Sequence, residues 1–186
     1  MRLFIAVNLP PGEQDRIAAA TRQLRDGGLP VRWVAPDAYH LTLKFLGEVS
    51  PPVADALTEV VRDVALRHRA FPLRLRGTGV FPNLRRPAVW WIGSEPSAPL
   101  SALQRDVERA VAPLGFEPEQ RAFSAHLTLG RTTRDAPPGA LAGAGPLLQS
   151  VDLDRTITIE TLDLMRSHLS PRGARYERVC AASFRP

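Results

Sequence analysis

The chain contains very little cysteine. Cys180 is the only one among 186 residues, so no disulfide can form within the chain and no cysteine-rich zinc cluster can be assembled. No apolar stretch approaches the ~20 residues that cross a bilayer, and the apolar start at residues 3–7 is too short for a signal peptide. We therefore expect a cytoplasmic protein that has no membrane partner.

Lysine is almost absent as well. Lys44 is the only lysine among 24 basic residues, and the formal net charge is +5. A basic chain favours polyanions such as RNA, and a guanidinium can bind one phosphate through two hydrogen bonds. So uneven a choice of arginine over lysine also fits coding bias. The charge therefore leaves a nucleic-acid partner open without requiring one.

Size and hydropathy indicate one folded unit. The chain has a mass of 20.4 kDa, with 44% hydrophobic and 23% charged residues, which is typical of a globular protein and argues against disorder. A chain of this length has room for one domain with a substantial core. We expect residues 1–186 to form a single domain, and we expect a monomer.

The spacing of apolar residues predicts helices interleaved with strands. Helices are expected at 14–24, 53–67 and 100–114. Strands are expected at 3–8, 31–34, 40–49, 71–81, 88–93 and 123–131, with two or three more within 147–153, 157–166 and 175–182. Because most strands follow one another as hairpins, the pattern predicts an α+β fold with antiparallel sheets.

One tetrapeptide occurs twice. His40-Leu41-Thr42-Leu43 returns as His126-Leu127-Thr128-Leu129, each time on an expected strand. Side chains at positions i and i+2 of a strand share one face, so each copy presents an imidazole beside a hydroxyl while its leucines face the core. The repeat suggests two related halves that bring both pairs to one cleft around an approximate twofold axis.

Two imidazoles and two hydroxyls suit displacement at phosphorus. Near neutral pH one imidazole can act as a base and the other as an acid, while Thr42 and Thr128 donate to the non-bridging oxygens. A zinc site fits less well, because neither tetrapeptide has an acid two or four residues after its histidine, and the first acid that follows His40 is Glu48, eight residues later. The alternative without chemistry is an alternating, half-buried strand whose histidine is structural.

The residues that follow each motif are candidates for substrate binding. Strict alternation places Arg131 with the leucines, so it reaches the cleft to bind phosphate only if Gly130 breaks the pleat through a bulge. Lys44 shares a face with His40 and is a second candidate, whereas Phe45 is expected in the core.

Aromatic residues supply the remaining candidates. Trp90 and Trp91 point to opposite faces, so one is expected in the core and the other, for which we choose Trp91, is free to stack on a nucleobase. Tyr176 is expected to line the same cleft.

The sequence resembles the two-histidine (2H) phosphoesterases, most closely the bacterial and archaeal RNA 2′,3′-cyclic phosphodiesterases once named 2′-5′ RNA ligases. Four segments carry the resemblance: residues 2–7, 40–47, 126–131 and 164–169, with Gly173 and Tyr176 after the last. It implies a bilobed α+β fold in which two antiparallel sheets face a central cleft with helices outside. It also implies catalysis without a metal or another cofactor.

The resemblance further implies hydrolysis of an RNA terminal 2′,3′-cyclic phosphate to a 2′-phosphomonoester. By that analogy His40 is the proton donor to the departing 3′ oxygen, and His126 is the proton acceptor from water. The near-symmetry of the motifs leaves an exchange of these roles open. Three alternatives also stay open: 2′-5′ RNA ligation, hydrolysis of small cyclic nucleotides, and an RNA-end binding module without turnover.

Overall fold

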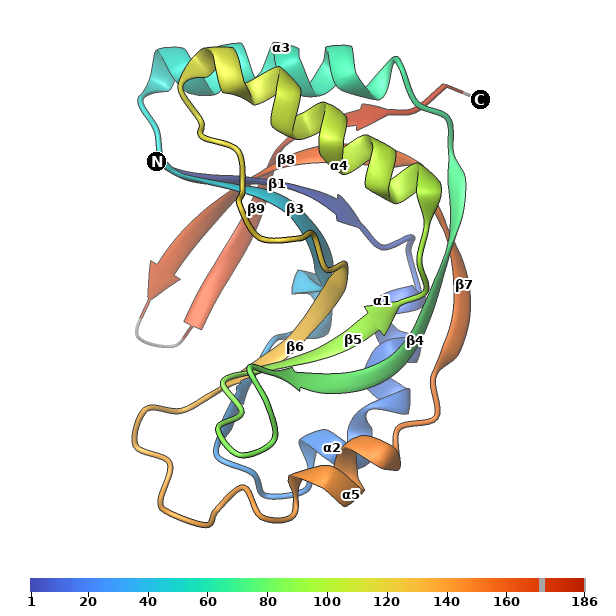
Figure 1. Cartoon of the computed structure of the whole chain (residues 1–186), viewed down its shortest axis with the longest axis vertical. Helices are drawn as coiled ribbons and strands as arrows, with labels where there is room; N and C mark the ends of the chain where they lie inside the picture. The colour runs from blue at the N-terminus through green and yellow to red at the C-terminus, as the bar shows by residue number, and fades with distance from the viewer. Residues whose placement is uncertain (171–172, 186) are drawn as a thin grey trace.

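The structure is a computed structural model that describes residues 1–170 and 173–185. Its strands form one antiparallel sheet in the order β7-β4-β5-β6-β3-β1-β8-β9, and β2 pairs with β6 (Figure 1). The strands are β1 (Arg2–Asn8), β2 (Val31–Trp33), β3 (His40–Glu48), β4 (Phe71–Phe81), β5 (Val89–Ser94), β6 (His126–Thr132), β7 (Asp154–Ile159), β8 (Thr161–Ser170) and β9 (Gly173–Ser183). The helices are α1 (Glu13–Ala20), α2 (Arg22–Arg25), α3 (Pro51–Ala65), α4 (Ala98–Val111) and α5 (Ala144–Gln149), with short 3₁₀ turns at Pro36–Ala38 and Ala112–Leu114.

The sheet consists of two wings that meet at β3 and β6. One register pair, Leu41 opposite Leu127, joins these two strands. Strands β1, β8 and β9 extend from β3 on one side of this junction, and β5, β4 and β7 extend from β6 on the other (Figure 1). The two antiparallel sheets expected from the sequence are therefore the two wings of one continuous sheet, and each wing carries one copy of the repeated motif.

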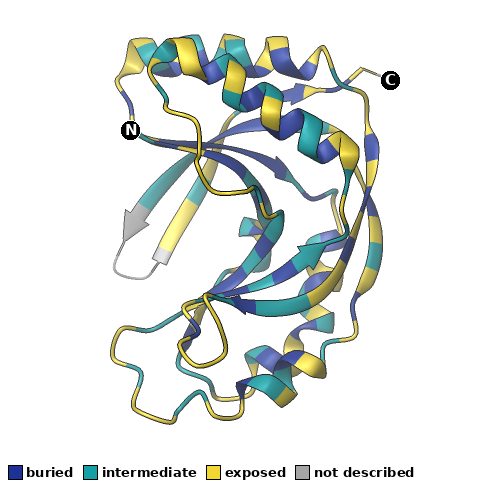
Figure 2. Cartoon of the chain, viewed as in Figure 1, coloured by how far each residue is buried: buried dark blue, intermediate teal, exposed yellow. Residues whose placement is uncertain are grey.

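Helices cover one face of the sheet. Helix α3 packs on β8, β9 and α4, and α4 also packs on β3, while α5 packs on β4 and α2. The inward sides of α3 and α4 are buried and their outward sides exposed, as Figure 2 shows. Leu41, Leu127 and the apolar side of these helices belong to one core cluster. A separate small cluster of Phe4, Ala6 and Met165 lies on the opposite face of the sheet.

Two expected elements differ in the structure. Residues 147–153 do not form a strand, because α5 covers residues 144–149, and Pro146 lies in its first turn, where a proline costs no hydrogen bond. The helix expected over 14–24 is interrupted at Thr21, whose hydroxyl donates to the carbonyl oxygen of Ile17 at 2.8 Å. In residues 1–170 and 173–185, no helix is both long enough and apolar enough to cross a membrane.

Candidate active site

The two histidine motifs lie side by side at the junction of the wings. Leu41 and Leu127 are opposite each other and fully buried on the helix side. By strand alternation, His40, Thr42, His126 and Thr128 lie on the other face, which we call the histidine face. Antiparallel pairing one residue to either side of Leu41 and Leu127 sets His40 beside Thr128 and Thr42 beside His126.

Each imidazole is oriented by a backbone carbonyl two residues earlier. Nδ1 of His40 lies 2.8 Å from the carbonyl oxygen of Ala38, and Nδ1 of His126 lies 2.8 Å from that of Ser124. A carbonyl oxygen only accepts hydrogen bonds, so Nδ1 carries the hydrogen in both rings. Nε2 of each ring is therefore left to accept or donate a proton, as general acid–base chemistry requires.

The surroundings of the two histidines differ. His40 packs against Phe4 and Tyr176, with ring centroids 4.9 Å away in both cases. This burial lowers the pKa of His40 below its ordinary value, the charge of His126 lowers it further, and the hydrogen bond to Ala38 opposes both. His126 contacts the ring of Phe81 at 5.1 Å. Both imidazoles lie on the histidine face next to the Leu41–Leu127 pair, so they border a common space.

Thr42 and Thr128 supply the hydroxyls expected beside these imidazoles. Both side chains are half-buried. Within the described part of the chain, neither hydroxyl has a hydrogen-bond partner. Both hydroxyls are free to donate to a bound oxyanion. Thr42 and Thr128 lie on opposite sides of the Leu41–Leu127 pair, so they can reach such an oxyanion from two sides.

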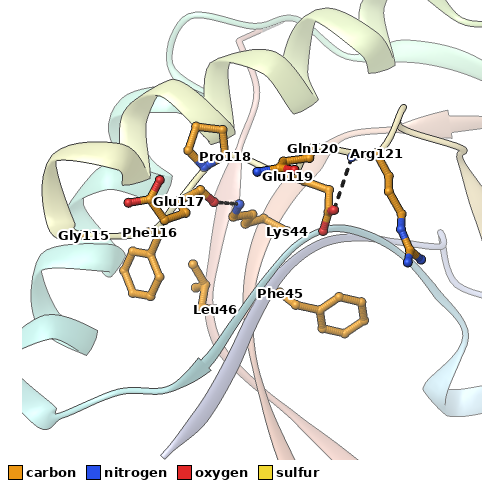
Figure 3. Close-up of a pocket in the computed structure, with 10 residues that line it drawn as sticks. All are labelled: Lys44, Phe45, Leu46, Gly115, Phe116, Glu117, Pro118, Glu119, Gln120 and Arg121. Atoms are coloured by element: carbon orange, nitrogen blue, oxygen red, sulfur yellow. Dashed lines mark hydrogen bonds between the residues drawn. The ribbon is translucent and has the colours of Figure 1, made fainter.

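The prediction that Lys44 shares a face with His40 is wrong. A bulge at Leu43 breaks the alternation of β3: Ala6 pairs with Thr42, but the preceding residue Ile5 pairs with Lys44. Lys44 therefore turns to the helix side, where its ammonium donates to Glu108 at 2.7 Å. It also donates to the carbonyl oxygen of Glu117 at 2.6 Å, as Figure 3 shows. The side chain of Lys44 is only 7% exposed, so its ammonium binds hydrogen-bond acceptors that belong to the protein itself.

The same bulge overturns the expectation that Phe45 lies in the core. Phe45 points away from Lys44 in Figure 3 and is 68% exposed. It pairs with Phe4, and the two rings lie 6.1 Å apart on the histidine face. Phe45 is thus an exposed aromatic ring on the histidine face.

Arg131 reaches the histidine face through an equivalent bulge. Trp90 pairs with Gly130 and the next residue of β5, Trp91, pairs with Thr128, so Leu129 is the extra residue of β6. The bulge turns Gly130 toward the core, where an added Cβ would lie 2.7 Å from Val31 and 2.8 Å from Trp33. Arg131 consequently turns to the opposite side and is exposed. The break in the pleat that the sequence required for Arg131 is present, as a bulge whose extra residue is Leu129, directly before Gly130.

Trp90 and Trp91 lie on opposite faces of the sheet, as expected. Trp90 is fully buried and its indole N–H donates to Thr132. Trp91 lies opposite Thr128 on the histidine face, with its ring against Phe81 and so close over Gly79 that a Cβ there would collide with it at 2.3 Å. The indole nitrogen of Trp91 is buried, and no described residue is its hydrogen-bond partner.

Tyr176 lies beside His40, as expected of a residue that lines the site. Its ring meets His40 edge-on, and burial raises the pKa of its hydroxyl, while the charges of Arg131 and Arg2 oppose this rise. Sequence reasoning missed the contributions of Phe4 and Phe81, which were treated only as parts of apolar strands. For Phe4 a signal exists, because Leu3, Ile5 and Val7 occupy the core side of β1 and leave Phe4 on the other face.

These groups support acid–base chemistry on a phosphate ester. The histidine face holds two oriented imidazoles, two free hydroxyls, an exposed guanidinium and several aromatic rings. Among residues 1–170 and 173–185, no group of three or more His, Cys, Asp or Glu side chains is placed to hold a metal ion.

Comparisons with known proteins agree with this chemistry. The chain is 35% identical over 176 residues to the RNA 2′,3′-cyclic phosphodiesterase of Methanothermobacter thermautotrophicus, which covers 95% of both chains. It is 31% identical to the enzyme of the same name from Archaeoglobus fulgidus, over 95% of this chain and 97% of the relative.

Solved structures show the same fold. The protein TT0787 of Thermus thermophilus superposes with a TM-score of 0.83 at 30% identity, over 99% of this chain and 98% of that one. Escherichia coli LigT complexed with 3′-AMP superposes with a TM-score of 0.75 at 27% identity, over 98% and 97%. The model of the 2′-5′ RNA ligase superfamily matches residues 9–171. The resemblance noted in the sequence is thereby confirmed, and the chain belongs to the 2′-5′ RNA ligase superfamily of two-histidine phosphoesterases.

Proposed function

We propose that the protein hydrolyses the terminal 2′,3′-cyclic phosphate of RNA to a 2′-phosphomonoester without a metal ion. The observation that carries the proposal is the pairing of Leu41 with Leu127, because it brings both imidazoles and both threonine hydroxyls to one face. The curated relatives named RNA 2′,3′-cyclic phosphodiesterase, which match over nearly the whole chain, support the choice of substrate.

In the proposed reaction His126 is the proton acceptor. Its Nε2 takes a proton from water as the water oxygen attacks phosphorus, and the bond from phosphorus to the 3′ oxygen breaks on the opposite side. His40 is the proton donor and transfers its Nε2 proton to the departing 3′ oxygen, which leaves as a hydroxyl. The phosphate remains on the 2′ oxygen.

The environment of His40 fits a proton donor that becomes protonated when the substrate binds. The pKa of His40 is lowered in the free protein by burial against Phe4 and Tyr176. A bound phosphodiester carries a negative charge, which favours the imidazolium form and raises this pKa again. The proton would therefore be held most firmly when the substrate is in place.

The remaining groups hold the phosphate and the nucleoside. Thr42 and Thr128 donate to the non-bridging oxygens, whose charge rises as water attacks. Arg131 contributes a cation on the same face, and Trp91 and Tyr176 provide aromatic surface for the nucleoside. Lys44 takes no part, because its ammonium is bound to Glu108 and Glu117.

A product assay tests the proposal. A short RNA that ends in a 2′,3′-cyclic phosphate is incubated with the protein, with and without a chelator, and the products are separated as 2′- and 3′-phosphates. We expect the 2′-phosphate at the same rate in both conditions. Formation of the 3′-phosphate, or activity that a chelator abolishes and a divalent ion restores, would contradict it.

The same assay separates the alternatives. A 5′-hydroxyl RNA added to the mixture would be joined to the cyclic phosphate end by a 2′-5′ ligase, and a cyclic mononucleotide would be the better substrate of a small-molecule phosphodiesterase. A binding module would give no product. We propose further that residues 1–186 act as one domain and as a monomer in the cytoplasm, which gel filtration and cell fractionation would test.

A further inference from the structure

Two arginines lie directly opposite each other beside the proposed active site. In the antiparallel pairing of β2 with β6, Arg32 is the register partner of Arg131. Val31 and Trp33, the neighbours of Arg32 in β2, pack against the core, so Arg32 turns to the other side. Both arginines are therefore exposed on the histidine face.

This pair is electrostatically unfavourable as it stands. Like charges opposite each other on antiparallel strands destabilise a sheet. In the part of the chain that the structure describes, neither guanidinium has an ion-pair or hydrogen-bond partner. By contrast, Arg74 and Arg76 in β4 bind Asp154 and Glu95. Two unneutralised guanidiniums that face the same way form a site for an anion.

We propose that Arg32 and Arg131 together bind the phosphodiester on the 5′ side of the terminal nucleotide of an RNA substrate. This inference rests on the proposed function. Thr128 and Arg131 pair with Trp91 and Val89, which are two residues apart in β5, so Arg131 follows Thr128 by about 7 Å along the strand. A nucleotide chain whose last phosphate lies between His40 and His126 can reach that far with its next phosphate.

The charges around the site favour a path for the RNA chain past Arg131 over a path past Phe45. Beyond Phe45 lies a pocket of about 520 Å³ lined by residues 115–121, which include Glu117 and Glu119. The cations of this pocket are Arg121 and Lys44, and Lys44 is bound to Glu108, so the two carboxylates leave an excess of negative charge that repels a phosphate chain. At the other end, the exposed Arg85 and Arg86 lie in the turn that leads into β5, the strand next to Arg131. The cationic path therefore runs from Thr128 to Arg131 and Arg32.

The subsite distinguishes an RNA end from a mononucleotide. A nucleoside 2′,3′-cyclic phosphate with a 5′-hydroxyl has no second phosphate, whereas a dinucleotide that ends in the same cyclic nucleotide has one. We therefore expect the dinucleotide to be the better substrate, and we expect this preference to depend on Arg32.

The experiment compares kcat/KM for these two substrates in the wild-type protein and in Arg32→Ala. The ratio of dinucleotide to mononucleotide kcat/KM is expected to fall about tenfold in Arg32→Ala, because a partly exposed charged hydrogen bond is lost. Arg32→Lys should keep part of the preference. The matched control is Arg105→Ala, an exposed arginine of α4 outside the histidine face, which should leave the ratio unchanged.

A binding measurement keeps the inference testable if no hydrolysis occurs. The affinity of a fluorescent oligoribonucleotide that ends in a 2′-phosphate is measured by anisotropy at several salt concentrations. Arg32→Ala should weaken binding about tenfold and reduce its salt dependence. Equal affinity and an equal substrate ratio in Arg32→Ala and the wild type would overturn the inference. Absence of hydrolysis in the wild type, with weaker binding by Arg32→Ala, would overturn only the proposed function.

Discussion

Leu41 and Leu127 lie opposite each other at the single register pair that joins β3 to β6. Both leucines are fully buried on the helix side, so they hold the two wings together through the core. The residues on either side of each leucine face the other way, and each histidine lies beside the threonine of the other motif. The same pair of residues thus joins the wings and assembles the candidate active site.

Removal of either imidazole should abolish most of the turnover. We expect His40→Ala and His126→Ala each to lower kcat by about 10²- to 10⁴-fold, the usual contribution of one general acid or base. Steady-state hydrolysis of a cyclic phosphate RNA measures the loss. Because the two groups act as a unit, the double variant should lose less than the product of the single losses. Normal turnover by His126→Ala would remove the second motif from the mechanism.

The pH profile should show which histidine donates the proton. The pKa of His40 lies below its ordinary value of 6.5 in the free protein, because burial and the charge of His126 disfavour its imidazolium form. If His40 is the donor, it must be protonated, so kcat/KM falls as the pH rises and this fall begins below pH 6.5. Substrate binding raises the pKa of His40, so the corresponding fall in kcat lies at higher pH.

The variant Tyr176→Ala tests whether His40 causes the fall in kcat/KM at high pH. Tyr176→Ala exposes His40 to water and raises its pKa, so the fall at high pH should move to higher pH. Phe81→Ala serves as the comparison, since Phe81 contacts His126 instead. Activity should also fall at low pH, where the proton acceptor becomes protonated. If Tyr176→Ala moves this second fall instead, His40 is the proton acceptor and the proposed roles are exchanged. Because the two imidazoles interact, the pKa values read from the profile belong to the pair of histidines, and the shift in each variant identifies the nearer ring.

The sequence was sufficient to predict the strands of the motifs and the face of their histidines. Alternation of leucine with histidine and threonine is a property of consecutive residues, so it can be counted without knowledge of the neighbouring strands. The same holds for Trp90 and Trp91. The meeting of the two motifs could only be proposed from an assumed twofold axis, and the pairing of Leu41 with Leu127 was not predicted, because it depends on how the two wings pack.

The residues after the motifs could not be predicted by counting. A bulge adds one residue and reverses the alternation, which is why Lys44 and Phe45 each lie on the face opposite to the expected one. Gly130 gave a sign of a bulge in the second motif, whereas the bulge in the first motif falls at Leu43, a residue that carries no such sign. The acidic partner of Lys44, Glu108, is 64 residues away and was equally beyond local reasoning.

Lys44 should matter for stability and not for substrate binding. Lys44→Met leaves the carboxylate of Glu108, 13% exposed, without its cation. We expect the free energy of unfolding to fall by about 3 kcal/mol, the low end for one partner of a buried ion pair, with KM unchanged. Urea denaturation and steady-state kinetics measure the two quantities.

An exposed ion pair provides the comparison for Lys44. Arg62 binds Glu59 one turn away in α3, and both side chains are more than half exposed. Arg62→Met should therefore cost less than about 1 kcal/mol. A raised KM with unchanged stability in Lys44→Met would show that Lys44 contacts the substrate after all.

Gly130 should be required for the position of Arg131. An alanine Cβ there would lie 2.7 Å from Val31 and 2.8 Å from Trp33, so β2 must shift. We expect Gly130→Ala to lower the free energy of unfolding by about 1–3 kcal/mol, as overpacking does, and to raise KM. In Gly145→Ala the new methyl group meets no atom within 4 Å, so stability should be equal or slightly higher. Equal stability of the two variants would count against the bulge geometry.

The threonines distinguish a catalytic face from a binding face. Valine is nearly the same size as threonine and lacks the hydroxyl, so Thr42→Val and Thr128→Val should leave the fold intact. If both hydroxyls donate to oxygens whose charge rises in the transition state, each change should raise the barrier by about 1–4 kcal/mol and lower kcat more than it weakens binding.

Kinetics at saturating substrate, with direct measurement of affinity for a 2′-phosphate RNA, separate the two effects for Thr42→Val and Thr128→Val. Thr133→Val is the control, because Thr133 follows the end of β6 and lies outside both motifs. A fall in kcat with nearly constant affinity supports transition-state stabilisation by the hydroxyls. Because each threonine lies beside the histidine of the other wing, the loss should be of similar size at both positions. If both variants turn over normally at saturation and only their affinity falls, the hydroxyls hold the ground state and the proposed role in catalysis is wrong.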